Sequence, residues 1–539
     1  MKHSLMSNVA DVIAKRLHNA GCRYAFGIPG GEVLALMEAL DRVGIRVILA
    51  KHENCAGFIG EGVHHFDGAP VILIATIGPG IANAVNVIAN ATQDRVPMIA
   101  LTGCVTDADQ HSYTHQVFDH VAMVTPVTKA AFRVSKDSAA TLADKAVAIA
   151  TEGRPGAVLL DVPVDVQKLK FTASEQLSRA PCAPMQPAPH CLEKARRWLA
   201  ESVRPLVIAG VDVLNQGGEQ SVADFCNRFN APLITSYKAK GVLPEDEMLA
   251  LGGAGLSPKC DKLMQPLLEK TDLIILAGYD PIEMRTGWRN PWPMEKRVIE
   301  FSAVSNLHYM HQAEMNFVGD VASGLNALSE GVSPRKTWSD GEPSFVRLAL
   351  YKSHNFNEEW GPAAVIDTCR ENMPRETVAS VDSGAHRILL SQMWPCYEPR
   401  ALLQSTALCT MGCAVPLAIG RKLAEPERPV IAFVGDAGME MFLGELATLR
   451  DLKLAVPIVV FVDESLGLIE LKQRNTGMHN LAVDFDGTDF PAVAKALGGE
   501  GVWCRDRASL QKALKAAQKR DTYTVIAAVI GEKAYDGRL

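Results

Sequence analysis

Long apolar runs are missing from this sequence. No stretch is long enough to cross a bilayer, and the opening residues MKHSLMSNVADVIAKRL lack the apolar core and cleavage site of a signal peptide. Basic runs and interleaved aromatic and basic residues are also missing, and the formal net charge is only −7. We therefore expect no membrane and no nucleic-acid partner, and we predict a cytoplasmic protein.

The cysteines lack the spacing of a disulfide framework or a zinc site. The sequence has 12 of them, scattered along the chain, and the closest pair, Cys409 and Cys413, has no matching second pair. This distribution predicts reduced and mostly buried thiols, as is usual in the cytoplasm.

The chain is too long for one hydrophobic core, because it has 539 residues. Short β-branched runs that end in Gly or Pro turns alternate with helical patterns, which predicts the α/β class with doubly wound parallel sheets. We predict three such domains, at residues 1–170, 190–330 and 355–539. Stretches without periodicity, 170–195 and GVSPRKTWSDGEPS, are predicted linkers. The first and third domains have similar patterns, which suggests a duplication.

Two aspartates follow buried strands in the last domain. Asp436 comes after VIAFVG, Asp463 comes after PIVVFV, and the amphipathic segment ELATLRDLKL lies between them. Because parallel strands end at the same edge of a sheet, this strand–helix–strand unit brings the two carboxylates together. A divalent cation such as Mg²⁺ would remove their repulsion, and the glycine-flanked turn at 435–438 could receive phosphate at a helix N-terminus. The alternative is that each aspartate caps a helix.

A third carboxylate, Glu53, follows a strand in the first domain, within ILAKHENCAGFIGEG. It enters a helix rich in Ala and Gly, so we expect it to be desolvated and able to carry a proton. A capping or surface role is the alternative. For its neighbour His52 a structural role is equally open.

The segment from 435 to 467 resembles the cofactor motif of thiamine-diphosphate enzymes of the acetolactate synthase-like family, which includes pyruvate oxidases and decarboxylases. That motif starts with Gly-Asp-Gly and closes with Asn-Asn or Asn-Asp, and here Asp463 follows Asp436 by 27 residues. Ala437 and Val462 depart from the usual Gly and Asn. The resemblance implies that Asp436, Asp463 and the Ser465 carbonyl bind Mg²⁺. It assigns these residues of the segment to cofactor binding: Gly435, Asp436, Ala437, Gly438, Asp463, Leu466 and Gly467.

The same resemblance extends over the whole chain. It implies a pyrimidine-binding domain, a central domain and a diphosphate-binding domain, in that order. Glu53 matches the glutamate that hydrogen-bonds the pyrimidine and promotes loss of the C2 proton from the thiazolium. Met411, in ALCTMGCAVPLAIG, matches a residue that wedges the cofactor into a V shape, and the Cys409 carbonyl matches the acceptor of its amino group. Both can also be read as a loop entering a buried helix.

Further loops resemble cofactor-binding loops of the family. They contribute Pro29 from GIPGGE, Gly78 and Asn83 from TIGPGIANAV, and Ser383, Gly384 and His386 from DSGAH. A solvated loop position is the alternative reading for His386.

The stretch TGCVTDADQHSYTHQVFDHVAMVTPVTK resembles catabolic, flavin-independent acetolactate synthases. This resemblance implies that His115 and Gln116 lie near the reaction centre and that Asp119 has a supporting role. LAGYDPIEMRTGW resembles the same branch, so FAD is not favoured, although the central domain can keep an FAD-like fold. Arg285 and Lys472 are candidates for binding a substrate carboxylate, with surface roles as the alternative.

The implied activity is that of a carboligase, which decarboxylates pyruvate or another 2-oxo acid and couples the product to a second carbonyl. The family usually carries a Trp in the helix after the metal motif, where this chain has Leu471 and Lys472. A non-ligating 2-oxo acid decarboxylase therefore remains an alternative, as does a non-catalytic metabolite-binding protein. No G-x-G-x-x-G turn with a suitably spaced acidic residue favours an NAD enzyme. The resemblance implies a homodimer or homotetramer with active sites shared between subunits.

Overall fold

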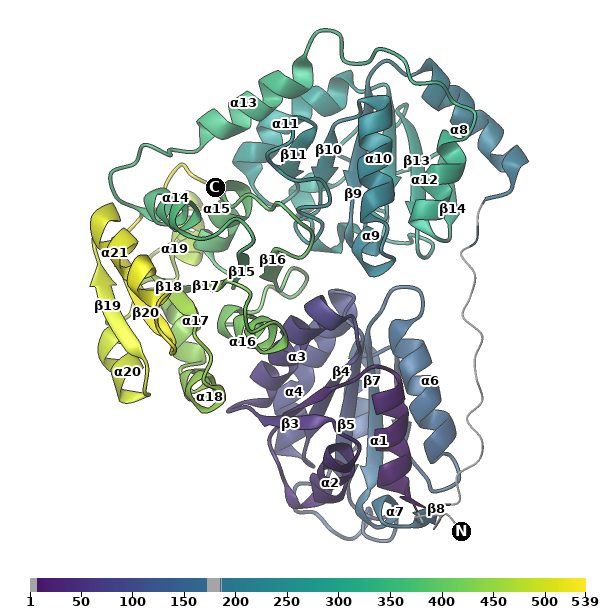
Figure 1. Cartoon of the computed structure of the whole chain (residues 1–539), viewed down its shortest axis with the longest axis vertical. Coiled ribbons are helices and arrows are strands. Elements are labelled where there is room, and N and C mark those ends of the chain that lie inside the picture. Colours follow the sequence, from purple (N-terminus) through teal and green to yellow (C-terminus); the bar gives the residue numbers. More distant parts are fainter. Residues whose placement is uncertain (1–6, 172–184, 186) are drawn as a thin grey trace.

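The computed structural model of the chain describes residues 7–171, 185 and 187–539. Within these residues the chain folds into three six-stranded sheets with helices packed around them (Figure 1). Every strand pair in the three sheets is parallel. The predicted α/β class with three parallel sheets is confirmed. None of the described helices is long and apolar enough to cross a membrane.

The N-terminal sheet has the order β3-β2-β4-β5-β7-β6. Its strands are β2 (Tyr24–Gly27), β3 (Arg46–Leu49), β4 (Val71–Ala75), β5 (Met98–Cys104), β6 (Ala130–Arg133) and β7 (Ala157–Pro163). Its helices are α1 (Val9–Asn19), α2 (Leu34–Arg42), α3 (Glu53–Asp67), α4 (Pro79–Gln93), α5 (His120–Val124), α6 (Ala139–Thr151) and α7 (Val164–Gln167), with 3₁₀ turns η1 (Gly31–Val33) and η2 (Thr125–Val127). A small antiparallel pair, β1 (Ser7–Asn8) and β8 (Lys170–Phe171), joins the two ends of this domain.

The central sheet has the order β11-β10-β9-β12-β13-β14. Its strands are β9 (Pro205–Ala209), β10 (Leu233–Thr235), β11 (Ala250–Gly253), β12 (Leu273–Ala277), β13 (Arg297–Ser302) and β14 (Met315–Val318). Its helices are α8 (Pro189–Glu201), α9 (Val211–Asn215), α10 (Glu219–Phe229), α11 (Pro258–Lys270) and α12 (Val321–Ser329), with 3₁₀ turns η3 (Pro281–Glu283) and η4 (Thr286–Trp288); α13 (Glu342–Ser353) leads to the last domain.

The C-terminal sheet has the order β16-β15-β17-β18-β20-β19. Its strands are β15 (Val378–Val381), β16 (Leu402–Gln404), β17 (Val430–Gly435), β18 (Pro457–Val462), β19 (Glu500–Cys504) and β20 (Thr524–Val529). Its helices are α14 (Pro362–Asn372), α15 (Ala385–Met393), α16 (Ala414–Ala424), α17 (Asp436–Met441), α18 (Glu445–Leu452), α19 (Gly467–Asn475), α20 (Phe490–Ala496) and α21 (Arg507–Ala517).

The first and last sheets share one strand order. Numbered within its own sheet, each follows 2-1-3-4-6-5, whereas the central sheet follows 3-2-1-4-5-6. The common order agrees with the similarity between the first and third domains that the sequence suggested.

The strands that sequence patterns did not predict lie at sheet edges, apart from the short pair β1–β8. They are β6, β11, β14, β16 and β19. β11 and β16 have only 4 and 3 residues, and the side chains of β6, β14 and most of β19 are partly or largely exposed. An edge strand does not need the continuous apolar run by which buried strands are recognised.

Both predicted linkers are partly wrong. Residues 172–184 and 186 of the first lie outside the described residues, but α8 already begins at Pro189. The second contains Trp338, which is buried and donates its Nε1–H to the Pro205 carbonyl at 2.8 Å, and α13 begins at Glu342. Short runs rich in Pro and polar residues did not reveal this packing. The described cysteines are all free, and all but Cys191 and Cys409 are buried.

The first and last domains of the chain share one hydrophobic core. α3 packs on α16, its topological counterpart after the second strand of the other sheet (Figure 1). The contact is symmetrical: a Cβ at Gly62 would lie 2.3 Å from the Leu417 carbonyl oxygen, and one at Gly420 would lie 1.9 Å from that of Ile59. Only glycine allows the two helices to approach so closely.

Candidate active site

Asp436 and Asp463 lie at the carboxyl edge of the C-terminal sheet. β17 and β18 are paired so that Gly435 stands opposite Phe461, which brings the residues after each strand together. Asp436 begins α17, and its Oδ2 accepts hydrogen bonds from the backbone N–H groups of Asp463 and Glu464 at 3.0 and 2.7 Å. The structure thus joins the two strand ends through one carboxylate, as the strand–helix–strand pattern predicted.

The surroundings of both carboxyl groups disfavour their charged forms. Burial raises the pKa of Asp436 above its usual value. Burial, followed by the charge of Asp436, raises the pKa of Asp463 to about 8. A hard divalent cation bound by oxygen would offset both effects, so the donor set fits Mg²⁺. In the part of the chain that the structure describes, no cluster of three or more His, Cys, Asp or Glu side chains is arranged to hold a metal.

A cavity of about 120 Å³ opens beside the two aspartates. It collects most of the residues that the sequence assigned to cofactor and metal in this domain: Ser383, Gly384, His386, Met411, Gly435, Asp436, Ala437, Gly438, Asp463, Ser465, Leu466 and Gly467. A Cβ at Gly467 would lie 2.6 Å from Oδ2 of Asp463, so a larger residue there would displace that carboxylate.

Asp382 organises the wall of this cavity, and sequence reasoning missed it. Its carboxylate accepts hydrogen bonds from the backbone N–H groups of Gly412 at 2.6 Å and Gly435 at 3.2 Å. Its Oδ1 also lies 2.7 Å from Nε2 of His386, whose ring stacks on Phe461. His386 is buried, so the solvated reading of this residue is wrong. The position of Asp382 directly after a buried strand was the available signal.

Cys409 does not line the cavity. Its backbone has φ +52°, a left-handed conformation that favours glycine, and its Sγ lies 3.0 Å from Nη1 of Arg387. Cys409 therefore carries a side chain in a backbone conformation that glycine adopts most easily.

Glu53 belongs to a second cluster, in the N-terminal domain. It is 5% exposed at the start of α3, and its Oε2 accepts a hydrogen bond from Nδ2 of Asn83 at 3.1 Å. The structure thus pairs two residues predicted to face the pyrimidine. His52 caps α3, because its Nδ1 accepts a hydrogen bond from the Asn54 N–H at 3.1 Å.

The Gly78 turn is held by His120, a residue that sequence reasoning missed. The Gly78 N–H donates to Nε2 of His120 at 3.3 Å, and Nδ1 of His120 lies 3.0 Å from Oδ1 of Asp161. A backbone N–H can only donate, so His120 accepts at Nε2 and carries its proton at Nδ1. Gln116 packs directly on this turn, because a Cβ at Gly78 would lie 2.6 Å from its carbonyl oxygen. No sequence motif distinguishes His120 from its neighbours.

Several predicted residues lie elsewhere. Glu53, Gly78, Asn83, Pro29, His115 and Gln116 are not among the residues that line the C-terminal cavity. Pro29, His115 and Gln116 are exposed on loops of the N-terminal domain, and Asp119 caps α5. Within this chain, the residues predicted to act on the pyrimidine and on the diphosphate therefore form separate groups.

The candidates for binding a substrate carboxylate have different environments. Arg285 forms an ion pair with buried Asp261 at 2.7 Å, so its charge is already matched. Lys472 is exposed on α19, a helix with no buried residue in this chain. In the YDP stretch, Asp280 is buried and pairs with Arg95 and Arg154 of the N-terminal domain at 2.8 and 3.3 Å. That aspartate therefore joins two domains.

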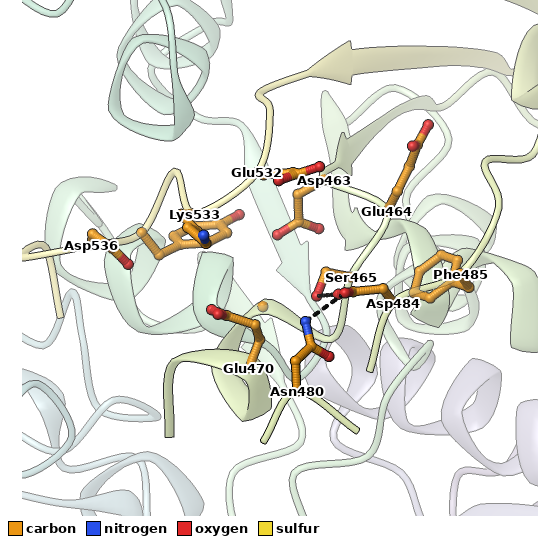
Figure 2. Close-up of a pocket in the computed structure, with 12 residues that line it drawn as sticks. Asp463, Glu464, Ser465, Glu470, Asn480, Asp484, Phe485, Glu532, Lys533 and Asp536 are labelled. Atoms are coloured by element: carbon orange, nitrogen blue, oxygen red, sulfur yellow. Dashed lines mark hydrogen bonds between the residues drawn. The ribbon is translucent and has the colours of Figure 1, made fainter. Parts of the chain in front are cut away.

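A strongly acidic pocket, drawn in Figure 2, adjoins the cavity and shares Asp463 with it. Its labelled side chains include Glu464, Glu470, Glu532 and Asp536, with Lys533 as the labelled cation. Asp484 also lines the pocket and accepts hydrogen bonds from Ser465 Oγ and Asn480 Nδ2 at 2.7 and 2.6 Å. The two hollows share Asp463, Ser465, Gly467 and Tyr535.

Comparison with known proteins identifies all three domains. Residues 7–123 match the thiamine pyrophosphate enzyme N-terminal TPP binding domain, residues 192–328 the central domain, and residues 382–528 the C-terminal TPP binding domain of the same enzymes. The cavity at Asp436 lies within the third match. The two strand ends at Asp436 and Asp463 are thus part of a thiamine pyrophosphate-binding domain.

Similar proteins cover most of the chain. The acetolactate synthase isozyme 1 large subunit of Escherichia coli K12 is 30% identical, over 86% of this chain and 83% of its own length. The acetolactate synthase of Bacillus subtilis strain 168 is 27% identical over 92% and 88%. The catabolic acetolactate synthase of Raoultella terrigena is 26% identical over 96% and 94%. With the three matching domains, these similarities show that the chain belongs to the thiamine-diphosphate-dependent enzymes of the acetolactate synthase-like family.

Proposed function

We propose that this enzyme is a Mg²⁺-dependent carboligase that decarboxylates a 2-oxo acid, with pyruvate favoured, and couples the product to a second carbonyl. The observation that carries the proposal is a pair of carboxylates, buried Asp436 and half-buried Asp463, beside a cavity built from glycine turns. This is the donor set for a metal-bound diphosphate. We propose no role for FAD.

The residues of the cavity would divide the work of binding. Asp436, Asp463 and the Ser465 carbonyl would hold Mg²⁺, and the glycine turn at 435–438 would face the diphosphate. Bound thiamine diphosphate would supply a nucleophilic carbon for the carbonyl of the 2-oxo acid and accept the electron pair left by CO₂. Met411, on the cavity wall, would orient the cofactor.

Glu53 would exchange a proton with the cofactor's pyrimidine ring. Its burial limits competition by water, and the Asn83 amide fixes its carboxylate. His115 and Gln116 would act near the substrate from their exposed loop. That loop and the exposed helix α19, which carries Leu471 and Lys472, would be covered in the assembled enzyme. We propose a homodimer or homotetramer in which Glu53 of one subunit completes the cavity of another.

We further propose that residues 1–170, 190–330 and 355–539 act as pyrimidine-binding, central and diphosphate-binding domains. We also propose that the enzyme belongs to the flavin-independent catabolic branch, which the stretches around His115 and Asp280 resemble. Synthases of more than one kind match the chain at similar identity, so this assignment depends on those stretches. A cytoplasmic location stays a prediction.

The direct test is turnover of pyruvate by purified protein with thiamine diphosphate and Mg²⁺. CO₂ release is followed, and the organic product is identified by mass spectrometry. We expect acetolactate from the wild type and at least about a hundredfold less from Glu53→Gln, the range of one proton-transfer group. Acetaldehyde as the main product would favour the decarboxylase. Glu53-dependent turnover of another 2-oxo acid would overturn the assignment of pyruvate. Binding of thiamine diphosphate without any turnover would favour a non-catalytic protein.

A further inference from the structure

The segment after β20 returns to the diphosphate cavity. Tyr535 in this segment is 4% exposed, and it lines both the cavity and the adjoining acidic pocket. A Cβ at Gly467 would lie 3.6 Å from Cδ2 of its ring. Tyr535 therefore packs beside the turn where α19 begins, next to Asp463.

Contacts on either side of Tyr535 hold this segment in place. Asp536 accepts hydrogen bonds from Nη1 and Nη2 of Arg474, on α19, at 2.8 and 2.7 Å. The Gly537 carbonyl accepts one from Lys259 of the central domain at 3.1 Å, and Arg538 forms an ion pair with Glu358. The residues labelled Glu532, Lys533 and Asp536 in Figure 2 show the segment passing along the acidic pocket. The tyrosine is thus placed by contacts with three other parts of the chain.

The Tyr535 hydroxyl group is a donor without an acceptor among the described residues, since none of the hydrogen bonds of the structure involves it. Burial, followed by the negative charges of Asp463, Asp436 and Asp382, raises its pKa well above the usual range. The group therefore keeps its proton at neutral pH. A hydroxyl group on a buried residue that lines a cavity is stabilised when a hydrogen-bond acceptor enters that cavity.

We propose that Tyr535 is a further ligand of the cofactor, its hydroxyl group donating a hydrogen bond to a diphosphate oxygen. The inference rests on the proposed function, because it places the diphosphate in this cavity. A phosphate oxygen is a strong charged acceptor, and Mg²⁺ at Asp436 and Asp463 would hold it within the same hollow. The segment that follows β20 thereby becomes part of the cofactor site.

The test compares Tyr535→Phe with Tyr523→Phe. The control removes a buried hydroxyl group that donates to the Ala494 carbonyl at 3.1 Å, outside the residues that line the cavity. Dissociation constants are measured by calorimetry at saturating Mg²⁺, for thiamine diphosphate and for inorganic diphosphate. We expect Tyr535→Phe to raise both constants about tenfold, the order of one hydrogen bond to a charged group, and Tyr523→Phe to leave them unchanged.

The possible results distinguish a failure of the Tyr535 inference from a failure of the proposed function. If the wild type binds thiamine diphosphate and Tyr535→Phe binds it equally well, the inference is overturned and the proposed function stands. A lower melting temperature of cofactor-free Tyr535→Phe with unchanged dissociation constants would show a merely structural residue, and would also overturn the inference. If the wild type itself binds no thiamine diphosphate, the proposed function fails first.

Discussion

At the scale of single residues, the site is built from carboxylates in different environments. Asp382 is matched by two backbone N–H groups and a histidine, so it serves as a fixed support. Asp463 is half-buried and faces a second carboxylate. Glu53 has one amide partner and lies in another domain. These different surroundings suit the proposed roles of a support, a metal ligand and a proton carrier.

The environment of Asp463 predicts that the stability of the metal-free protein depends on pH. Its pKa is raised from 3.8 to about 8, so the folded state holds this proton more tightly than the unfolded state. The stability due to the bound proton is complete below pH 3.8 and is lost as the pH rises toward about 8. We expect the melting temperature in EDTA to fall over this range, and to fall less steeply in Asp463→Asn.

Differential scanning calorimetry between pH 5 and pH 9 checks this expectation, with Mg²⁺ added back as a second condition. The exposed Asp521 supplies the matched control, Asp521→Asn, which should follow the wild-type profile. Identical profiles for wild type and Asp463→Asn would contradict the argument.

At the scale of secondary-structure elements, the packing of α3 on α16 joins the two cofactor-binding domains within a chain. Their crossing depends on Gly62 and Gly420, where added Cβ atoms would lie 2.3 and 1.9 Å from carbonyl oxygens. Because α3 begins with Glu53 and α16 follows the Met411 loop, this crossing sets the relative placement of two predicted site segments.

We therefore expect Gly62→Ala to lower the free energy of unfolding by about 2–3 kcal/mol. The added methyl group forces the two helix backbones apart, and the free-energy cost of that shift exceeds the gain from the higher helix propensity of Ala. Urea unfolding measures the change. Gly31→Ala is the control, because a Cβ at Gly31 meets nothing within 4 Å. Equal stability of the two variants would show that the helices separate without cost.

At the scale of the whole molecule, the residues proposed to act on the pyrimidine and on the diphosphate form two separate groups within the chain. The diphosphate cavity lacks Glu53 among its lining residues, and α19 beside it has no buried residue. Buried ion pairs fix how the domains of one chain meet: Arg154 pairs with Asp212 at 3.0 Å and with Asp280 at 3.3 Å, across the boundary between N-terminal and central domains. On the proposed function, a second subunit would bring the two groups of residues together.

Sharing of sites predicts complementation between inactive variants. Glu53→Gln loses the proton carrier and Asp463→Ala loses a metal ligand, but a hybrid dimer has one site with both groups intact. Random mixing makes half of the dimers hybrid, so we expect about a quarter of wild-type activity after co-expression. Assays of co-expressed, differently tagged subunits check it. Activity no higher than that of either variant alone would mean that each site belongs to one chain.

Sequence pattern by itself determined the buried strands of the sheets and the meeting of Asp436 and Asp463. Short, β-branched apolar runs such as VIAFVG and PIVVFV, bounded by turns, are typical of buried parallel strands, and parallel pairing brings Asp436 and Asp463 to one edge. The glycine-containing turns after such strands were predicted to bind the cofactor, and those of the C-terminal domain line the cavity. These features are local, so a single segment of sequence contains the physical reason for each.

Tertiary structure alone decided the rest. Edge strands such as β6 and β14 form because a neighbouring strand offers hydrogen bonds, whatever their own hydrophobicity. The support by Asp382, the His120 bond to the Gly78 turn and the approach of Tyr535 to Asp463 join residues far apart in the chain. Such contacts depend on how separate elements pack. The periodicity or short motif of one segment carries no information about which distant segment it will contact.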